Sequence, residues 1–278
     1  MSITPPETTS NYIRVPKELI LAPAIGDKRV ICYSYFFQNM TNDNTVLYTC
    51  DYLIRWCGFT PSRKKSKKDN CSINDKFSQV VEWLHQNYYI SDFEADEFGG
   101  HNFQYCAVDK ERFFSSGNFA IIYDFEFQIL KSYESKYKPL TNSVILLVLT
   151  YIRLNMWRRI YQYTGESETT KKEKPEIFNK QYSEISSDLG VSSRLISRSI
   201  DALENFGIIA VKHMPRFKDE TGQWHTEDTI FVNSYRYLYD TKTRKHKLDC
   251  DYDYEKEIRY GIKFLQERKY SSKKFYQD

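Results

Sequence analysis

Apolar residues between positions 185 and 209 recur with a helical period. The recurring positions are Ile196, Ile200, Leu203 and Phe206. Residues spaced three or four apart line one face of a helix, so we predict a helix over residues 192–206. A shorter helix is predicted directly before it, over residues 182–189. The pattern therefore indicates two consecutive helices.

A glycine marks the end of each of these helices. Gly190 follows the first helix and Gly207 follows the second, and glycine readily adopts the left-handed backbone found at helix ends. Ser192 precedes the second helix, where a hydroxyl accepts a hydrogen bond from a free backbone N–H. Val191 fills the corner between the helices. We predict a helix-turn-helix with a tight turn at Gly190.

Two short strands are predicted after the second helix. Residues 208–213 form an extended pattern, residues 218–222 are polar and turn-forming, and residues 229–232 return. A helix-turn-helix followed by a two-stranded hairpin is a winged helix. The alternative is a plain helical hairpin in a core, with arginines that merely face solvent. The glycines and the hairpin favour the winged helix.

The first half of the chain carries the same succession of patterns. Its predicted helix, strand, helix, helix and hairpin span residues 28–40, 45–48, 50–57, 72–88 and 89–108. In the second half, a helix over residues 140–161 precedes the helix-turn-helix, and the hairpin spans 210–232. Two copies of one architecture predict an α+β, mainly helical fold. The expected fold is tandem winged helix-turn-helix domains with small antiparallel β wings.

The predicted domain boundaries follow from this repeat. They are a flexible N-terminal tail (1–11), winged-helix domain 1 (12–118), a linker (119–139), winged-helix domain 2 (140–239) and a charged C-terminal tail (240–278). Residues 165–175 are charged and aperiodic, so we expect an exposed loop within the second domain. The C-terminal tail is expected to be partly helical over residues 254–268, with Ile258, Ile262 and Leu265 facing inward.

The polar face of the predicted helix over residues 192–206 is the first candidate site. This face carries Ser192, Ser193, Arg194, Ser197 and Arg198. Short polar side chains and arginines on an exposed helix suit entry into a DNA major groove, where base edges present hydrogen-bonding groups. We therefore expect these residues to bind DNA.

A basic run before the third helix of the first domain is the second candidate site. It contains Arg63, Lys64, Lys65, Lys67 and Lys68, and Lys76 follows on the helix. In a helix-turn-helix this region lies near the phosphate backbone, where lysines bind without sequence preference. The alternative is a solvated charged loop, which is what charge runs usually are. The position before the helix favours phosphate contact.

Composition and missing motifs exclude several other classes of protein. The net charge is only +3, so a nucleic-acid site must come from local patches. The sequence has no phosphate-binding G-x-x-x-x-G-K-[ST] loop, and its five histidines and six cysteines lack metal-ligand spacing. We expect no enzyme activity, no cofactor and no metal. The longest apolar run, residues 144–149, is too short to span a bilayer and predicts a buried core helix. Reduced cysteines and no signal peptide indicate a cytoplasmic protein.

Three segments resemble bacterial plasmid and mobile-element replication initiators built from winged helices. They are the opening Tyr12-Ile-Arg-Val-Pro-Lys-Glu-Leu19, the helix from Asp27 onward, and GVSSRLISRSIDALENFGII at residues 190–209. The resemblance covers about residues 12–239 with loose motifs. It implies binding to repeated double-stranded DNA sites at an origin and recruitment of host replication proteins. The last segment is equally similar to many winged-helix transcription regulators.

Three functions therefore remain open from the sequence. The first is an origin-binding replication initiator of a plasmid, phage or other mobile element. The second is a transcriptional regulator, and the third is an adaptor whose winged helices bind protein instead of DNA. Self-association is possible under each, and no membrane partner is expected. Two DNA-binding domains in one chain suit a repeated DNA site, which favours the replication initiator.

Overall fold

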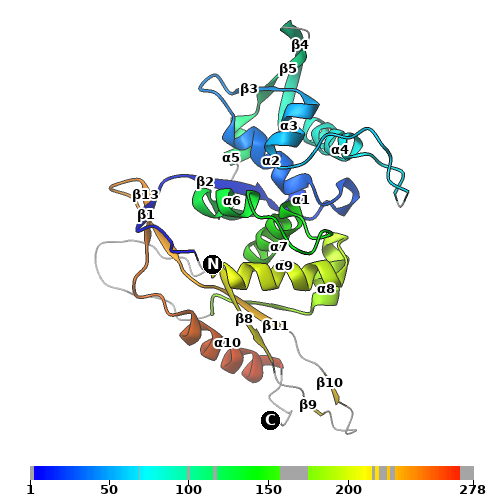
Figure 1. The fold of residues 1–278 in the computed structure, drawn as a ribbon. Helices are drawn as coiled ribbons and strands as arrows, with labels where there is room; N and C mark the ends of the chain where they lie inside the picture. Colours follow the sequence, from blue (N-terminus) through cyan, green and yellow to red (C-terminus); the bar gives the residue numbers. More distant parts are fainter. Residues whose placement is uncertain are drawn as a thin grey trace. The chain divides into compact units, whose positions relative to one another are not determined.

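The computed structural model is an α+β fold with small antiparallel sheets (Figure 1). It describes residues 3–67, 69–98, 101–114, 118–156, 175–214, 217–218, 224–225 and 229–269. The chain forms two compact units. Unit 1 contains residues 1–10, 155–185 and 200–278, and unit 2 contains residues 11–154 and 186–199.

Unit 2 contains most of the helices. Its elements are β2 (Tyr12–Pro16), α1 (Lys17–Ile20), η1 (Pro23–Ile25), α2 (Arg29–Gln38), β3 (Thr45–Tyr48), α3 (Cys50–Trp56), α4 (Ile73–Gln86), β4 (Ile90–Phe98), β5 (His101–Val108), α5 (Lys110–Phe114), β6 (Phe119–Tyr123), α6 (Asp124–Lys131) and α7 (Asn142–Asn155). One sheet has the strand order β3-β5-β4, and a second pairs β2 with β6. Every pairing is antiparallel.

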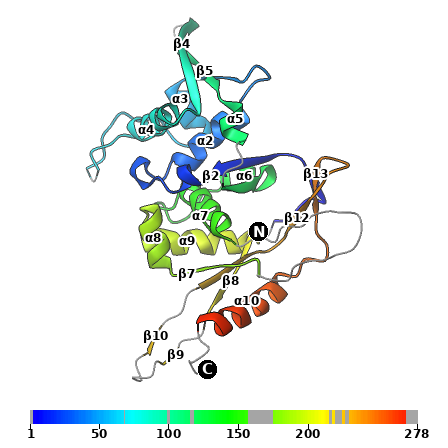
Figure 2. The ribbon, with the colours of Figure 1, turned by 180° about the vertical axis from the view of Figure 1, so that it is seen from behind.

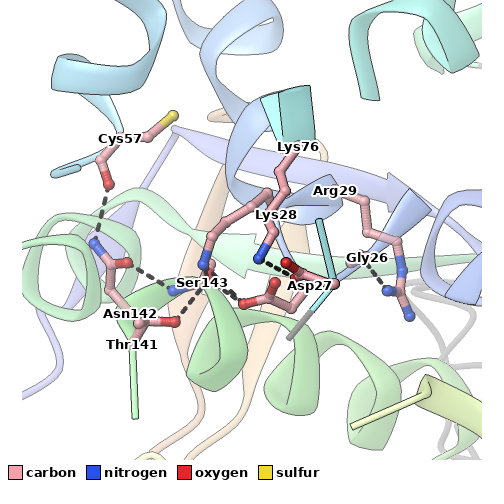
Figure 3. A network of polar contacts seen from close by, with 10 residues as sticks. Gly26, Asp27, Lys28, Arg29, Cys57, Lys76, Thr141, Asn142 and Ser143 are labelled. Atoms are coloured by element: carbon pink, nitrogen blue, oxygen red, sulfur yellow. Dashed lines mark hydrogen bonds and ion pairs between the residues drawn. The ribbon is translucent and has the colours of Figure 1, made fainter. Parts of the chain in front are cut away.

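Helices α2 and α7 carry the longest runs of buried residues in the described part of unit 2. Residues 142–153 of α7 are all buried, so the prediction of a buried core helix is confirmed. Polar contacts join the start of α7 to the rest of the unit (Figure 3). The Lys28 ammonium donates to Ser143 Oγ at 3.0 Å, and the Asn142 amide donates to the carbonyls of Cys57 and Lys131. Burying a polar group away from water costs free energy unless the group forms a hydrogen bond, so each of these bonds offsets that cost.

Unit 1 contains mainly strands and one long helix. Its elements are β1 (Thr8–Thr9), β7 (Phe178–Lys180), β8 (Ile209–His213), β9 (Phe217–Lys218), β10 (Trp224–His225), β11 (Thr229–Asn233), β12 (Tyr237–Asp240), β13 (Lys245–Leu248) and α10 (Tyr254–Lys269). The strand orders are β7-β11-β8, β1-β13-β12 and β10-β9. Helix α10 lies beside β11 (Figures 1 and 2).

Helix α10 matches the helix predicted in the C-terminal tail. Its apolar face packs against the β7-β11-β8 sheet of the same unit. Ile258, Ile262 and Leu265 join a core with residues of the β7-β11-β8 sheet. The approach is close at Gly261, where an added Cβ would lie 2.8 Å from Ile177 Cδ1. A glycine inside a helix is unfavourable by itself. Here it permits the contact between α10 and Ile177.

One order of elements occurs twice along the chain. Helix, strand, helix, helix, strand, strand is the order of α2, β3, α3, α4, β4, β5. The same order recurs in α7, β7, α8 (Tyr182–Leu189), α9 (Ser193–Asn205), β8 and β11, with the short strands β9 and β10 inserted between β8 and β11. In both sheets the last of the three strands lies in the middle, giving β3-β5-β4 and β7-β11-β8. Helices α8 and α9 each continue from one unit into the other.

The helix ends of the two copies also match. Gly58 and Gly190 follow α3 and α8 with φ of 82° and 67°. The next amide bonds back to the helix in both, from Phe59 to Ile54 and from Val191 to Ser186. At the ends of α4 and α9, Tyr88 and Gly207 have φ of 61° and 68°. A tyrosine therefore occupies a left-handed position that is glycine in the second copy.

The predicted linker over residues 119–139 is not a linker. Residues 119–123 form β6, which pairs with β2 from Tyr12 opposite Tyr123 to Pro16 opposite Phe119. Helix α6 follows, and Glu126 forms a buried bidentate ion pair with Arg153 at 2.6 and 2.7 Å. The polar composition of residues 131–139 suggested a linker, but the preceding strand finds its partner more than 100 residues earlier in the chain. The predicted winged-helix domain 2 includes helix α7. In the structure, α7 instead belongs to unit 2, together with residues 11–141 from the N-terminal half of the chain.

Residues 3–11 of the predicted flexible N-terminal tail are also held in place. Thr8 and Thr9 pair with Lys247 and His246 of β13. The Tyr237 hydroxyl donates to the Pro6 carbonyl at 2.7 Å, and the backbone amide of Ile3 donates to the Phe206 carbonyl. Long-range strand pairing gives order to a segment that has too few apolar residues to predict it. The charged loop predicted over residues 165–175 falls, except for Pro175, outside the described residues.

Candidate nucleic-acid interface

The N-terminal half of α9 exposes the polar face that the sequence predicts. Ser192, Ser193, Arg194 and Arg198 are exposed, and Ser197 is half-buried. On the opposite face, Ile196, Ser199, Ile200 and Leu203 are buried. The Ser192 carbonyl accepts from the amides of Leu195 and Ile196, so the helix starts where the N-cap was predicted. Five candidate residues thus share one accessible face.

The turn before α9 is fixed by residues from the start of the chain. Val191 is 7% exposed, and a Cβ on Gly190 would lie 3.1 Å from Pro23 Cβ. The fully buried Arg29 donates from Nη2 to the carbonyl of Leu189, the last residue of α8, at 3.3 Å. A positive charge at a helix C-terminus is favourable because the carbonyls there carry partial negative charge. These contacts set where α9 begins.

Arg29 also binds the segment between α1 and α2. Its guanidinium donates to the Ile20 carbonyl at 2.8 and 3.1 Å and to the Gly26 carbonyl at 2.5 Å. Burial lowers the pKa of Arg29 to about 10, and the nearby Asp27 carboxylate opposes that shift. One buried side chain of α2 therefore joins the end of α1, the residue after η1 and the end of α8.

A second contact fixes the last turn of α8. The Tyr151 hydroxyl of α7 donates a short hydrogen bond to the Asp188 carboxylate. Tyr151 is 2% exposed, so its ring is anchored in the core of unit 2. Helix α8 is therefore tied to α7 through Tyr151 and to α2 through Arg29.

An aromatic side chain lies against both candidate arginines of α9. Tyr137 belongs to the loop between α6 and α7 and is half-buried. The Arg194 Cζ atom lies 5.0 Å from the centroid of its ring, and the Arg198 Cζ atom lies 6.0 Å away. A cation over an aromatic face is attracted by the quadrupole of the ring. Lys136 and Lys138, both exposed, flank Tyr137.

The basic loop between α3 and α4 presents free charges at the surface of unit 2. Arg63, Lys64, Lys65 and Lys67 are exposed, and none has an ion-pair partner in the part of the chain that the structure describes. Lys68 lies outside the described residues. Asn74 anchors the loop, because its Oδ1 accepts from the Ser62 amide at 2.8 Å. The loop is therefore both basic and held at one end.

Lys76 differs from these residues because it already has an acidic partner. Its ammonium lies 2.7 Å from Asp69 Oδ2. The hydrogen bond from Lys76 lowers the pKa of Asp69 to about 2, together with a backbone bond from Cys71. The positive charge of Lys76 is therefore balanced within the protein, unlike the charges of the exposed loop lysines.

Helix α4 offers a less basic face than α9. It begins with a capping box of Ser72 and Asp75, and Phe77, Val80 and Leu84 are buried. Its exposed residues include Ser78, Gln79, Glu82 and His85. Beyond its end, Tyr88 is 79% exposed although its backbone is left-handed. The acidic Glu82 disfavours close approach of phosphate to this face.

Sequence reasoning missed three residues that shape this region. Tyr137 and its flanking lysines form a visible basic–aromatic triplet, but they fell within the predicted linker. Arg29 lies in the helix predicted over residues 28–40, and nothing local indicates that its guanidinium reaches Leu189. Tyr88 follows α4 at the position that Gly207 has after α9, and an alignment of the two halves of the chain reveals this equivalence.

Within the described ranges, no helix combines the length and apolar character needed to cross a membrane. Those ranges also contain no group of three or more His, Cys, Asp or Glu side chains able to hold a metal ion. The sequence matches no protein-family model and no curated protein.

Proposed function

We propose that this protein binds duplex DNA sequence-specifically, with α9 as the helix that enters the major groove. The observation that carries the proposal is the exposed polar face of α9, which follows an anchored turn and holds Arg194 and Arg198. Arginine donates two parallel hydrogen bonds to guanine O6 and N7, and serine reaches bases or phosphates. This combination on one accessible helix face suits base recognition.

The repeated order of elements supports a tandem winged-helix architecture. A winged helix consists of a helix, a strand, two helices joined by a turn, and a two-stranded wing that pairs with the first strand. Both copies have this order, apart from the short strands β9 and β10 between β8 and β11 of the second copy. In both three-stranded sheets the last strand lies between the other two. In the proposal, α4 and α9 are the recognition helices. The hairpins β4–β5 and β8–β11 are the wings.

The basic loop supplies contacts that do not depend on sequence. Four described cations of residues 63–67 are exposed and unpaired, so they are available to phosphates. Each phosphate contact releases counterions and contributes about −0.9 to the slope of log affinity against log salt. Replacing Lys64, Lys65, Lys67 and Lys68 by glutamine should weaken binding to every duplex and flatten this slope. An unchanged slope would mean that the loop is only solvated.

We propose that the cellular role is replication initiation for a plasmid, phage or other mobile element. Two DNA-binding heads in one chain raise the effective concentration of the second head once the first is bound, which suits repeated sites. The segments at residues 12–19 and 190–209 resemble such initiators. In this role the protein marks the origin, and recruited host replication proteins open and copy the DNA.

The DNA-binding proposal is tested by selecting bound sequences from a pool of random duplexes. We expect a defined motif to be enriched and to occur in the DNA flanking the gene. Arg194→Ala or Arg198→Ala should weaken binding to that motif by about 1–3 kcal/mol, with a smaller loss on random duplex. Lys242→Ala is the matched control, since it removes an exposed charge from the hairpin between β12 and β13. Equal losses of affinity for the selected and the random duplex would mean that the arginines contact only the DNA backbone.

The cellular role is tested by placing the gene and its flanking DNA on a replicon that lacks an origin. Maintenance that disappears with Arg198→Ala would support initiation. If the DNA is never maintained but a neighbouring promoter responds to the protein, it is a transcriptional regulator. If the protein enriches no duplex motif at all, the adaptor function is favoured.

A further inference from the structure

The loop between α6 and α7 places a basic–aromatic triplet beside the candidate recognition helix. Tyr137 lies against Arg194 and Arg198, with 5.0 and 6.0 Å between its ring centroid and their Cζ atoms. Lys136 and Lys138 are its immediate neighbours in the chain, and both are exposed. We call these five residues the Tyr137 surface. All five belong to unit 2.

The cations of this surface differ from the structural cations of the same unit. Lys28, Lys76 and Arg153 each have a carboxylate within 2.8 Å. Within the described ranges, Lys136, Lys138 and Arg194 have no such partner. Their charge is not neutralised inside the fold, so it is available to an anion outside it.

The loop that carries Tyr137 is ordered by its own hydrogen bonds. The Tyr137 amide donates to Ser135 Oγ at 3.1 Å, and the Tyr137 carbonyl accepts from the Leu140 amide at 2.8 Å. Leu140 is 5% exposed, which anchors the end of the loop in the core. The backbone that carries the aromatic ring is therefore held in place before any ligand arrives.

A fixed ring beside two arginines restricts their side chains. Arginine loses considerable rotamer freedom when it is immobilised against a base. The N–H donors of a guanidinium lie in its plane, so contact of one face with a ring leaves the donors at its edge accessible. Both arginines remain exposed. The ring therefore orients them without occupying the groups that would contact DNA.

We propose that Tyr137 is a positioning residue for Arg194 and Arg198, and that Lys136 and Lys138 bind the phosphates flanking the bases that α9 contacts. This inference rests on the proposed DNA binding by α9. It assigns the α6–α7 loop to the interface, as a contact separate from the basic loop between α3 and α4. The partner is the sugar–phosphate backbone of duplex DNA.

The test measures the affinity of the full-length protein for its selected duplex and for a random duplex at several salt concentrations. Tyr137→Ala should lower the affinity for the selected duplex by about two- to fivefold for each arginine that depends on the ring, since a cation–ring contact at an exposed site is worth about two- to fivefold. The affinity for random duplex should change little, and the salt slope should be unchanged. Tyr137→Phe keeps the ring and should retain wild-type selectivity.

The two lysines are tested as a pair. The double variant Lys136→Ala, Lys138→Ala should lose affinity for both duplexes alike, and its salt slope should be shallower by about 1.8, or 0.9 for each phosphate contact. Thermal unfolding of every variant establishes that the fold is retained. Lys242→Ala again controls for the loss of an exposed charge.

Defined outcomes would overturn the inference. Wild-type selectivity in Tyr137→Ala, or equal loss on both duplexes, would refute the positioning role. An unchanged salt slope in the lysine pair would refute phosphate contact. If Arg198→Ala lowers selectivity while Tyr137→Ala keeps the wild-type selectivity and the lysine pair keeps the wild-type salt slope, only this inference fails. If the wild-type protein enriches no duplex, or prefers single-stranded RNA, the proposed function fails with it.

Discussion

Replacing Gly190 by alanine tests whether the turn between α8 and α9 is fixed by residues far away in the sequence. Gly190 has φ of 67°, and an added Cβ would lie 3.1 Å from Pro23 Cβ. The left-handed backbone costs a non-glycine residue about 1–2 kcal/mol. Reduced freedom of the unfolded chain returns about 0.4–1 kcal/mol. The tight contact adds strain of about 1 kcal/mol, at the low end for overpacking. We expect Gly190→Ala to destabilise the protein by about 2 kcal/mol.

The assay is thermal unfolding, combined with a double-mutant cycle. A loss of about 2 kcal/mol should lower Tm by roughly 4–8 °C for a unit of 150–250 residues. Pro23→Gly removes the Cβ that Gly190→Ala would meet, so the double variant should recover about 1 kcal/mol relative to the sum of the single variants. The backbone strain should remain in the double variant.

Two results would refute this reasoning. If Tm is unchanged in Gly190→Ala, the turn tolerates a side chain and is not fixed by its backbone. If the two substitutions are additive, the contact between Gly190 and Pro23 contributes nothing. A functional readout accompanies the assay: a displaced turn moves the start of α9, so the selectivity for the selected duplex should fall in Gly190→Ala.

Three further substitutions test the described contacts. Glu126→Gln breaks the buried bidentate pair with Arg153 and should lower the free energy of unfolding by about 3–5 kcal/mol, because it leaves a buried charge without its partner. Tyr88→Gly should raise it by about 0.5–1 kcal/mol, because the relief of left-handed strain exceeds the entropy cost of glycine. Gly261→Ala should destabilise the protein although alanine favours helices by about 1 kcal/mol, because its Cβ would lie 2.8 Å from Ile177 Cδ1.

Each of these has a matched control and a contradicting outcome, read from urea unfolding. Glu134→Gln removes an exposed carboxylate and should have little effect, whereas equal effects of both glutamines would contradict the buried pair. A destabilised Tyr88→Gly would mean that the exposed ring makes contacts that outweigh its strain. Ile177→Val removes Cδ1 and should partly rescue Gly261→Ala. Without rescue, the close approach of α10 is not the cause.

Local pattern alone determined the longer helices and several of the strands. Strand β3 and helix α8 have the bounds that periodicity predicts, and α10 differs from its prediction by one residue. The turns at Gly190 and Gly207 are left-handed, as predicted from glycine at helix ends. These features depend on neighbours three or four positions away, so the sequence contains their causes within a short window.

Long-range pairing decided where the compact units begin and end. Residues 119–123 read as a connection until β2 supplies hydrogen bonds from the other end of the unit. Residues 8–9 read as a loose tail until β13 pairs with them. A short strand has no stability alone, and its partner cannot be inferred from its own residues. The same reason explains why β12 and β13 were not predicted.

In the candidate site too, some features follow from local sequence pattern and others only from tertiary packing. The exposure of Arg194 and Arg198 follows from the period of α9, because buried isoleucines on one face place the arginines on the other. The contact of Tyr137 with both arginines, and of Arg29 with the end of α8, joins residues 57 to 160 positions apart. Only the packing of α2 against the end of α8, and of the α6–α7 loop against α9, creates these contacts. Helix periodicity determined which side chains are presented, and tertiary packing decided what holds them in place.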